Sequence, residues 1–171
     1  MPHSQRSRIT AATDFVYGRM RHRGAWGSAT AEPLSPQHGF GSLQGHKYCL
    51  LTTFRKSGEP VPTPVWFGLA DGKAYFRTEA AVGKVKRIRN NPRVRVAPCT
   101  LRGRPLGPPA EGLARVLGPE GTDRAERAIS ANYGLFRRIY EAIGQRLSSI
   151  EQVYIEIAPL SPADAGAPAA T

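Results

Sequence analysis

The chain has 171 residues, a length that fits one folded domain with a sizeable core. Its 24 basic and 13 acidic residues give a formal net charge of +11, which favours anionic partners: nucleic acid, an anionic membrane surface, or a phosphorylated or carboxylated ligand. All four histidines lie at or before position 46, so a histidine triad, zinc site or general base is excluded from the main body unless the N-terminal segment folds back.

The two ends of the chain differ in composition from its middle. Residues 1–44 mix Arg, Gly, Ser and Pro without a sustained hydrophobic period, so we expect a flexible N-terminal extension. The folded domain is expected over residues 45–159, followed by a disordered tail over 160–171. No apolar run is long enough for a signal peptide or a membrane span, which predicts a cytoplasmic protein that binds no membrane.

The first half of the domain carries strand patterns separated by turn signals. Strands are predicted over residues 48–54, 61–69 and 73–78. Asp71-Gly72 is the signal for a tight two-residue turn between the second and third strands. Pro60, Pro62 and Pro64 cannot donate ladder hydrogen bonds, so the second strand should lie at a sheet edge or be bulged.

The hydrophobic period changes after Ala80. Val82, Val85 and Ile88 recur at three-residue spacing, which predicts a short helix that Asn90-Asn91-Pro92 ends. Further strands are predicted over residues 93–97, 111–117 and 152–158, and further helices over 119–133 and 135–147. About six strands with two or three flanking helices predict a mainly β fold, a six-stranded antiparallel barrel.

The short helix carries a candidate anion site. Lys84 and Arg87 are three residues apart and share a helix face, and Thr78 places a hydroxyl just upstream. With the free N–H groups of the helix start, these side chains can cradle a phosphate or a carboxylate. The alternative is a solvated basic face. The stretch from residue 84 to 104 holds eight basic residues and no acidic one, which favours the cradle.

The strand over 61–69 is a candidate platform for a flat ring. Trp66 and Phe67 point to opposite faces, so only one faces the core and the other meets a ligand or a partner chain. Pro62 and Pro64 leave carbonyls without a competing local donor, and these carbonyls and the Thr63 hydroxyl can bond a flavin-like ring. The alternative is an edge strand that only resists aggregation.

Other ligand classes find less support. Single-stranded nucleic acid needs aromatic rings among basic residues, yet none occurs between Phe76 and Tyr133, and we expect no nucleic-acid binding. Zinc spacing, a Rossmann glycine pattern and a P-loop are missing from the sequence, so no metal site is expected. Cys49 and Cys99 are expected to be reduced thiols in the core or at an edge.

Three blocks carry a resemblance to a known family: KYCLLTTFRKSGEPVPTPVWF, YFRTEAAVGKVKRIRNNPRVRVAPC and RGRPLGPPAEGLARVL. Over about residues 46–158 the chain resembles the pyridoxamine-phosphate-oxidase-like (PPOX class) split-barrel family, and within it the actinobacterial group of probable F420-dependent oxidoreductases. The resemblance implies a six-stranded split β-barrel like that of FMN-binding proteins. It also implies a homodimer with two cofactor sites at the interface, and coenzyme F420 as the cofactor.

The same resemblance implies roles for individual residues. Along the deazaflavin ring it places Pro62, Thr63, Pro64, Val65 and Trp66. It implies that Thr78 and Lys84 hold the cofactor phosphate, with Lys86 and Arg87 close behind. Extra positive charge through Arg104 suits a tail with several carboxylates.

The implied activity is that of an F420H2-dependent reductase, which transfers a hydride from ring carbon C5 to a small electron-poor substrate. An FMN-dependent oxidase or reductase and a non-catalytic binder of F420 or a tetrapyrrole stay open as alternatives. No catalytic residue is assigned: the completing proton comes from solvent or from a residue such as Tyr133. Phe136 and Tyr140 are candidates to cap the pocket, with a plain core role as the alternative.

Overall fold

The computed structural model describes residues 23–134 and 151–161. The helix predicted over 135–147, with Phe136 and Tyr140, lies outside the described residues, as does most of the expected tail. The strands are β1 (Tyr48–Phe54), β2 (Pro60–Trp66), β3 (Gly68–Ala70), β4 (Lys73–Glu79), β5 (Arg93–Cys99), β6 (Ala110–Val116) and β7 (Gln152–Pro159). The helices are α2 (Gly24–Thr30), α3 (Gly83–Asn90) and α4 (Pro119–Tyr133), with short 3-10 turns η1 (Pro36–His38) and η2 (Gly41–Leu43).

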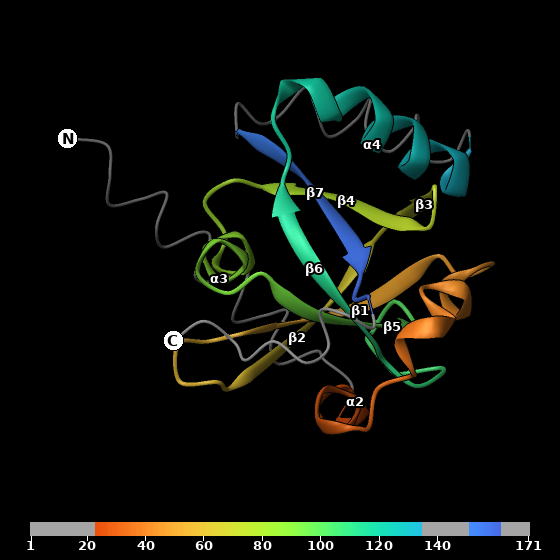
Figure 1. Ribbon diagram of the computed structural model, residues 1–171, viewed down its shortest axis with the longest axis vertical. Coiled ribbons are helices and arrows are strands. Elements are labelled where there is room, and N and C mark those ends of the chain that lie inside the picture. Colours follow the sequence, from red (N-terminus) through yellow and green to blue (C-terminus); the bar gives the residue numbers. More distant parts are fainter. Residues whose placement is uncertain (1–22, 135–150, 162–171) are drawn as a thin grey trace.

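The strands form one antiparallel sheet in the order β2-β1-β5-β6-β7-β4-β3, and this sheet is strongly curled (Figure 1). Its interior is filled by apolar side chains. The predicted mainly β architecture is confirmed: the curled sheet is a half-barrel of the split-barrel kind. It has seven strands where six were predicted. Among the described helices, none is long and apolar enough to cross a membrane.

The additional strand arises because the predicted strand over 61–69 is interrupted at Phe67. The Phe67 N–H donates to the hydroxyl of Tyr133, 3.1 Å away, and the Phe67 carbonyl accepts a hydrogen bond of 2.9 Å from Asn132 Nδ2. Both partners belong to the end of α4. These two bonds take the Phe67 backbone out of the ladder, so β2 ends at Trp66 and β3 begins at Gly68.

Gly68 lets α4 approach this break closely. A Cβ atom built on Gly68 would lie 2.1 Å from the carbonyl oxygen of Ala128, a backbone atom of α4 that cannot move aside without moving the helix. Only glycine therefore fits where β3 meets α4.

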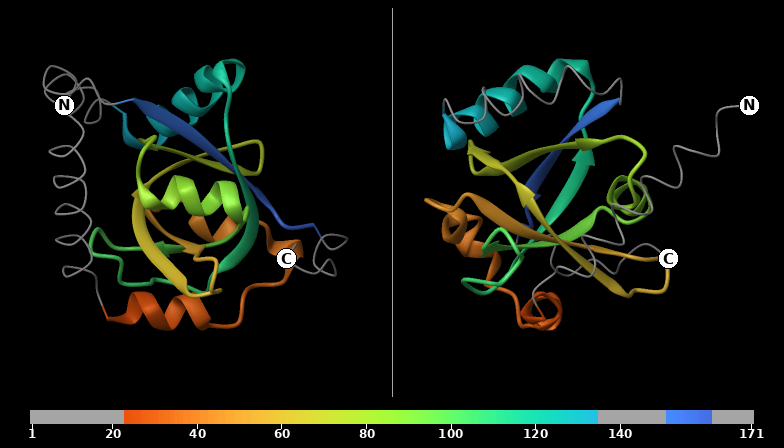
Figure 2. Two further views of the ribbon diagram at one scale, coloured as in Figure 1. Left: turned by 90° about the vertical axis from the view of Figure 1, so that its left-hand side faces the viewer. Right: turned by 180° about the vertical axis from the view of Figure 1, so that it is seen from behind.

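The interior of the barrel is filled by one face of each strand, as the period of two requires. Its buried members include Leu51, Val65, Phe76, Val96, Ile155 and Ile157. Phe67, 1% exposed, joins them, so of the Trp66-Phe67 pair it is Phe67 that faces the core. Helix α3 lies across one end of the curled sheet (Figure 2) and buries Val85 and Ile88.

Part of the expected N-terminal extension packs on the barrel. Residues 24–43 contain α2, η1 and η2, and the side chains of Phe40 and Leu43 are 4% and 0% exposed in the barrel core. Gly112 of β6 makes room for the ring, because a Cβ atom there would lie 2.9 Å from Phe40 Cζ. Burial of isolated side chains leaves no periodic pattern, which explains why the sequence did not indicate it.

The outer face of the sheet is covered in two places. Helix α4 packs Ala125 and Ile129 against Tyr75 of β4, and α2 packs Ala25 against Leu50 and Ala97. Cys49 and Cys99 are buried free thiols, as predicted. Cys49 belongs to the barrel interior and Cys99 to the cluster under α2.

Candidate functional site

Helix α3 brings a dense positive charge to one end of the barrel. Its sequence, GKVKRIRN, holds four basic residues and no acidic one. Val82 precedes the helix in extended conformation, and its carbonyl accepts the N–H groups of Val85 and Lys86. The helix can form here because Val85 and Ile88 are buried on one face. The basic residues are left on the remaining faces.

Lys84 and Thr78 meet at the start of this helix. The Lys84 ammonium lies 3.3 Å from the Thr78 hydroxyl oxygen, and both side chains are half-buried. Thr78 is the penultimate residue of β4, so the pair forms where that strand turns into α3. An ammonium and a hydroxyl at this separation can both donate to one phosphate oxygen.

Arg87 reaches from α3 to β1. Its Nε–H donates to the hydroxyl oxygen of Thr53 over 2.7 Å, and that hydroxyl lies 3.5 Å from the carbonyl oxygen of Val61. Val61 stands opposite Thr53 in the β1–β2 ladder and directly precedes Pro62. Thr53 therefore joins the basic helix to the first residues of the predicted platform strand.

The far end of the Arg87 side chain lies beside Gly83. A Cβ atom on Gly83 would lie 2.9 Å from Arg87 Nη1, closer than real Cβ contacts allow. The guanidinium thus occupies a notch over the first helical turn that exists only because residue 83 has no side chain. Three donors of the predicted cradle, on Thr78, Lys84 and Arg87, are grouped around this turn, and their chemistry fits a phosphate group.

The platform strand β2 offers less open surface than its sequence suggests. Trp66 stacks on Tyr133, with ring centroids 5.1 Å apart, and meets the edge of the Tyr48 ring at 6.5 Å. These contacts are with rings of its own chain, and the expectation that Trp66 also meets a ligand or a partner chain stays a prediction. Pro64 is covered by the loop after β5, since a Cβ on Gly103 would lie 3.6 Å from Pro64 Cδ.

Strand β2 lies at one edge of the sheet. The strand ends the sheet order, which confirms the edge position predicted from its prolines. A proline cannot donate to β1, so Pro60, Pro62 and Pro64 take the alternate positions whose backbone points away from β1. This edge therefore carries carbonyl acceptors without N–H donors at three positions, of which Pro62 is buried and Pro60 and Pro64 are half-buried. Thr63, half-buried between them, adds a hydroxyl on the side of the barrel interior.

Tyr133 is engaged in holding the backbone. Its hydroxyl donates to the carbonyl of Lys47 and accepts the Phe67 N–H. With its proton donated to Lys47 and a lone pair accepting from Phe67, the hydroxyl connects the end of α4 to the backbone at the β2–β3 junction. The structure thus gives Tyr133 a positioning role, and its use as a proton donor, one option that the sequence left open, stays a prediction.

Only some of the basic residues predicted for the anion site lie together. Thr78, Lys84 and Arg87 come together, whereas Lys86 is exposed on another side of α3. Arg95, counted in the basic run, points elsewhere: it bonds Glu111 and the carbonyls of Ala29 and Ala31, and so ties α2 to β5. Sequence reasoning missed Thr53 and Gly83. A 34-residue separation between Thr53 and Arg87 leaves no local signal for the first.

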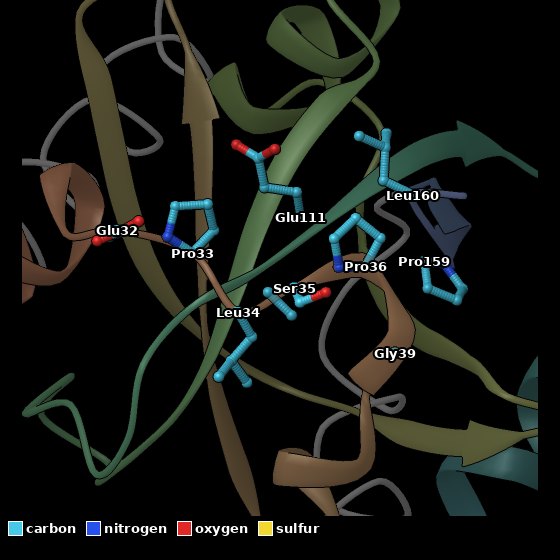
Figure 3. Close-up of a pocket in the computed structure, with 10 residues that line it drawn as sticks. Glu32, Pro33, Leu34, Ser35, Pro36, Gly39, Glu111, Pro159 and Leu160 are labelled. Atoms are coloured by element: carbon cyan, nitrogen blue, oxygen red, sulfur yellow. The ribbon is translucent and has the colours of Figure 1, made fainter. Parts of the chain in front are cut away.

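A separate cavity of about 200 Å³ lies between the segment 32–39 and the ends of β6 and β7 (Figure 3). Glu32 and Glu111 give it two carboxylates, and Pro33, Pro36 and Pro159 contribute to its walls. None of the predicted cofactor residues lines it. This cavity is therefore distinct from the cradle at α3.

Comparison with known proteins places this geometry in a family. Residues 40–158 match the family model described as pyridoxamine 5'-phosphate oxidase, which covers well over half of the chain. No curated protein matches the sequence.

Several solved structures share the fold. A conserved hypothetical protein from Mycobacterium tuberculosis is similar at 19% identity and a TM-score of 0.52, covering 81% of this chain and 91% of that one. The heme storage protein HutZ from Vibrio cholerae is similar at 14% identity and a TM-score of 0.53 (76% and 92% covered). An FAD-binding protein from Mesorhizobium loti is similar at 17% identity and a TM-score of 0.51 (75% and 91% covered). The split barrel, the grouped cations at α3 and the family match agree, and the chain belongs to the pyridoxamine 5'-phosphate oxidase family.

Proposed function

We propose that this protein is an F420H2-dependent oxidoreductase that reduces a small electron-poor organic substrate. The observation that carries the proposal is the grouping of Thr78, Lys84 and Arg87 around the first turn of α3, tied by Thr53 to the start of β2. Cations beside an edge strand whose proline positions turn away from β1 suit a ligand that is flat at one end and phosphorylated at the other.

In this proposal the two ends of the cofactor have different holders. Lys84, Arg87 and Thr78 bind the phosphate through charge-assisted hydrogen bonds. The edge of β2 from Pro62 to Trp66 positions the ring, with proline carbonyls and the Thr63 hydroxyl as partners for its polar atoms. Reduced F420, when bound, supplies a hydride from ring carbon C5. The chain itself orients the ring and excludes water from it, which is the usual division of labour with such cofactors.

Positive charge outside the cradle favours F420 over FMN. Lys86 is exposed on the same helix, and Arg102 and Arg104 are exposed in the loop beyond β5. A tail with several carboxylates can use such charges, whereas the single phosphate of FMN cannot use them all. FMN remains the second candidate, supported by the similarity in fold to the FAD-binding protein from Mesorhizobium loti.

A non-catalytic role in binding is the other candidate, supported by the similarity to the heme storage protein HutZ. Such a protein would bind F420 or a tetrapyrrole without turnover. The two roles differ in one observable: only the oxidoreductase oxidises reduced F420 when an acceptor such as a quinone or a nitroaromatic compound is added.

A homodimer belongs to the same proposal. Trp26 on α2 and Leu101 in the loop after β5 are 44% and 64% exposed, large values for apolar side chains, and both elements lie against β1 or β2. A second copy that covers these side chains would also close the edge of β2 over a bound ring. Light scattering on the purified protein measures the molecular mass in solution, and therefore whether the protein is a dimer.

Titration of the full chain with F420 and with FMN, followed by intrinsic tryptophan fluorescence, tests the cofactor. Micromolar binding of F420, and oxidation of F420H2 on addition of an acceptor, is the expected result. Micromolar binding of FMN with no binding of F420 would move the assignment to the flavin. Binding of neither would overturn the proposed function.

A further inference from the structure

We propose that Thr53 and Gly83 are positioning residues that hold the Arg87 guanidinium over the first turn of α3. The held guanidinium makes the site selective for a phosphorylated cofactor over the same ring system without its phosphate. This inference rests on the proposed function and extends it to two residues that the sequence did not single out.

Thr53 fixes the inner part of the arginine side chain. It is 1% exposed, on the interior face of β1, and an arginine can only donate, so its hydroxyl oxygen accepts the Arg87 Nε–H at 2.7 Å. The hydroxyl proton is directed to the Val61 carbonyl at 3.5 Å, a long hydrogen bond. A buried acceptor on a strand cannot follow a moving side chain, so the bond sets the direction of the guanidinium.

Gly83 makes room for the outer part. The 2.9 Å gap between a built Cβ and Arg87 Nη1 means that any larger residue would displace the guanidinium tip. The tip of an arginine is flexible, so alanine at position 83 would move the guanidinium rather than break the fold. Gly83 does not have a positive φ, and an alanine there meets no backbone strain.

Fixing Arg87 matters because arginine is a directional ligand. Its planar fork matches a phosphate, and a fork that is already in place loses less side-chain freedom on binding. Lys84 beside Thr78 supplies a point charge with less directional demand. We therefore assign phosphate selectivity to the held arginine and general anion attraction to the lysine.

The first test uses Thr53→Val and Thr53→Ser. Valine keeps the branched shape and removes the acceptor, whereas serine keeps the hydroxyl. For Thr53→Val we expect about tenfold weaker binding of F420 and of FMN. Binding should be unchanged for riboflavin, which differs from FMN only in the phosphate, and for deazariboflavin, which lacks both the phosphate and the tail of F420. Thr53→Ser should restore the affinity of the phosphorylated forms to within about threefold of the wild type. A purely structural role would weaken both forms alike.

The second test uses Gly83→Ala, which remains informative if Thr53→Val folds poorly. Alanine is the better helix former, so the unfolding temperature should stay equal or rise while F420 binding weakens about fivefold to tenfold. In an Arg87→Ala background neither Thr53→Val nor Gly83→Ala should weaken binding further, because both act through the same guanidinium.

The outcomes separate this inference from the proposed function. A wild-type protein that binds neither F420 nor FMN contradicts the proposed function. If the wild type binds either cofactor, two results for Gly83→Ala and Thr53→Val would overturn the inference alone. Either both variants bind the phosphorylated cofactors as tightly as the wild type does, or both lose affinity equally for the phosphorylated and the unphosphorylated compounds.

Discussion

The indole ring of Trp66 stacks on the phenol ring of Tyr133, with their centroids 5.1 Å apart and their planes inclined by 22°. Trp66 ends β2 and Tyr133 ends α4, so this pair joins the platform strand to the helix that covers the opposite edge of the sheet. The Tyr133 hydroxyl adds bonds to Lys47 and Phe67. The end of β2 is thereby fixed before any ligand binds.

Tyr133→Phe should destabilise the protein without removing cofactor binding. The change leaves the stacked ring in place but deprives the Phe67 N–H of its acceptor, at a cost of about 1–3 kcal/mol in the free energy of unfolding. Urea unfolding measures that cost, and fluorescence titration measures F420 binding. Turnover that collapses at full stability and full binding would instead make Tyr133 a proton donor.

Gly68→Ala should be far more disruptive than its size suggests. The added methyl group would lie 2.1 Å from the Ala128 carbonyl oxygen, so α4 must shift away from β3, and we expect a loss of about 3 kcal/mol or more. Gly27→Ala is the matched control: a Cβ there meets nothing within 4 Å and the residue lies in α2, so its stability should hold or rise. Equal thermal unfolding of the two variants would contradict the close approach of α4.

Some features of the fold could be predicted from the sequence, whereas the contacts between α4 and the β2–β3 junction could not. The Asp71-Gly72 turn was predictable because two residues with positive φ, 50° and 72°, carry their own signal. The bounds of α3 followed from its apolar spacing and its terminal Asn-Asn-Pro. The break at Phe67 was not predictable, since the side chain that causes it lies 66 residues further on.

The candidate site divides in the same way. Lys84 and Thr78 are six residues apart, and local spacing was enough to suggest that they meet. The role of Arg95 was hidden, because its partners Glu111 and Ala29 come from β6 and the N-terminal segment. The run of basic residues in the sequence therefore predicted more members of the cradle than the structure brings together. No sequence pattern indicated Thr53, which is an uncharged strand residue.

A buried carboxylate on the outer face of the sheet makes stability depend on pH. Glu156 is 5% exposed and accepts hydrogen bonds from Arg115 at 2.8 Å, from Lys73 at 3.1 Å and from Tyr75 at 3.1 Å. Burial by itself raises the pKa of Glu156, but the three hydrogen bonds outweigh burial and the pKa is lowered overall. A carboxyl with a lowered pKa stabilises the folded state above its unfolded pKa, and that stability is lost as the pH falls through the folded pKa.

Glu156→Gln should accordingly lower the free energy of unfolding by about 2 kcal/mol at pH 7. The difference from the wild type should shrink as the pH falls below about 4.3, where the unfolded carboxyl takes up its proton. Glu59→Gln breaks only an exposed ion pair with Arg55 and should cost less than about 1 kcal/mol. If the free energies of unfolding of the wild type and of Glu156→Gln differed by the same amount from pH 7 to pH 3, the lowered pKa of Glu156 would be ruled out.

Both thiols should be inert in the folded protein. Burial raises the pKa of Cys99 to about 12 and raises the pKa of Cys49 well above its usual value. The reactive form is the thiolate, so neither thiol should react with a disulfide reagent at pH 8 within minutes, and both should react once urea unfolds the chain. Rapid labelling of the native protein would show that one of these strands opens.

The most direct test of the cradle compares Lys84→Ala with Arg89→Ala. Each removes one positive charge from α3, but Lys84 is half-buried beside Thr78 whereas Arg89 is exposed. F420 affinity is measured for both at moderate salt. Lys84→Ala should weaken binding by about 1.5–3 kcal/mol, the worth of a charge-assisted hydrogen bond, and Arg89→Ala by less than about 0.5 kcal/mol. Equal affinities for the wild type and Lys84→Ala would contradict the phosphate site at the start of α3.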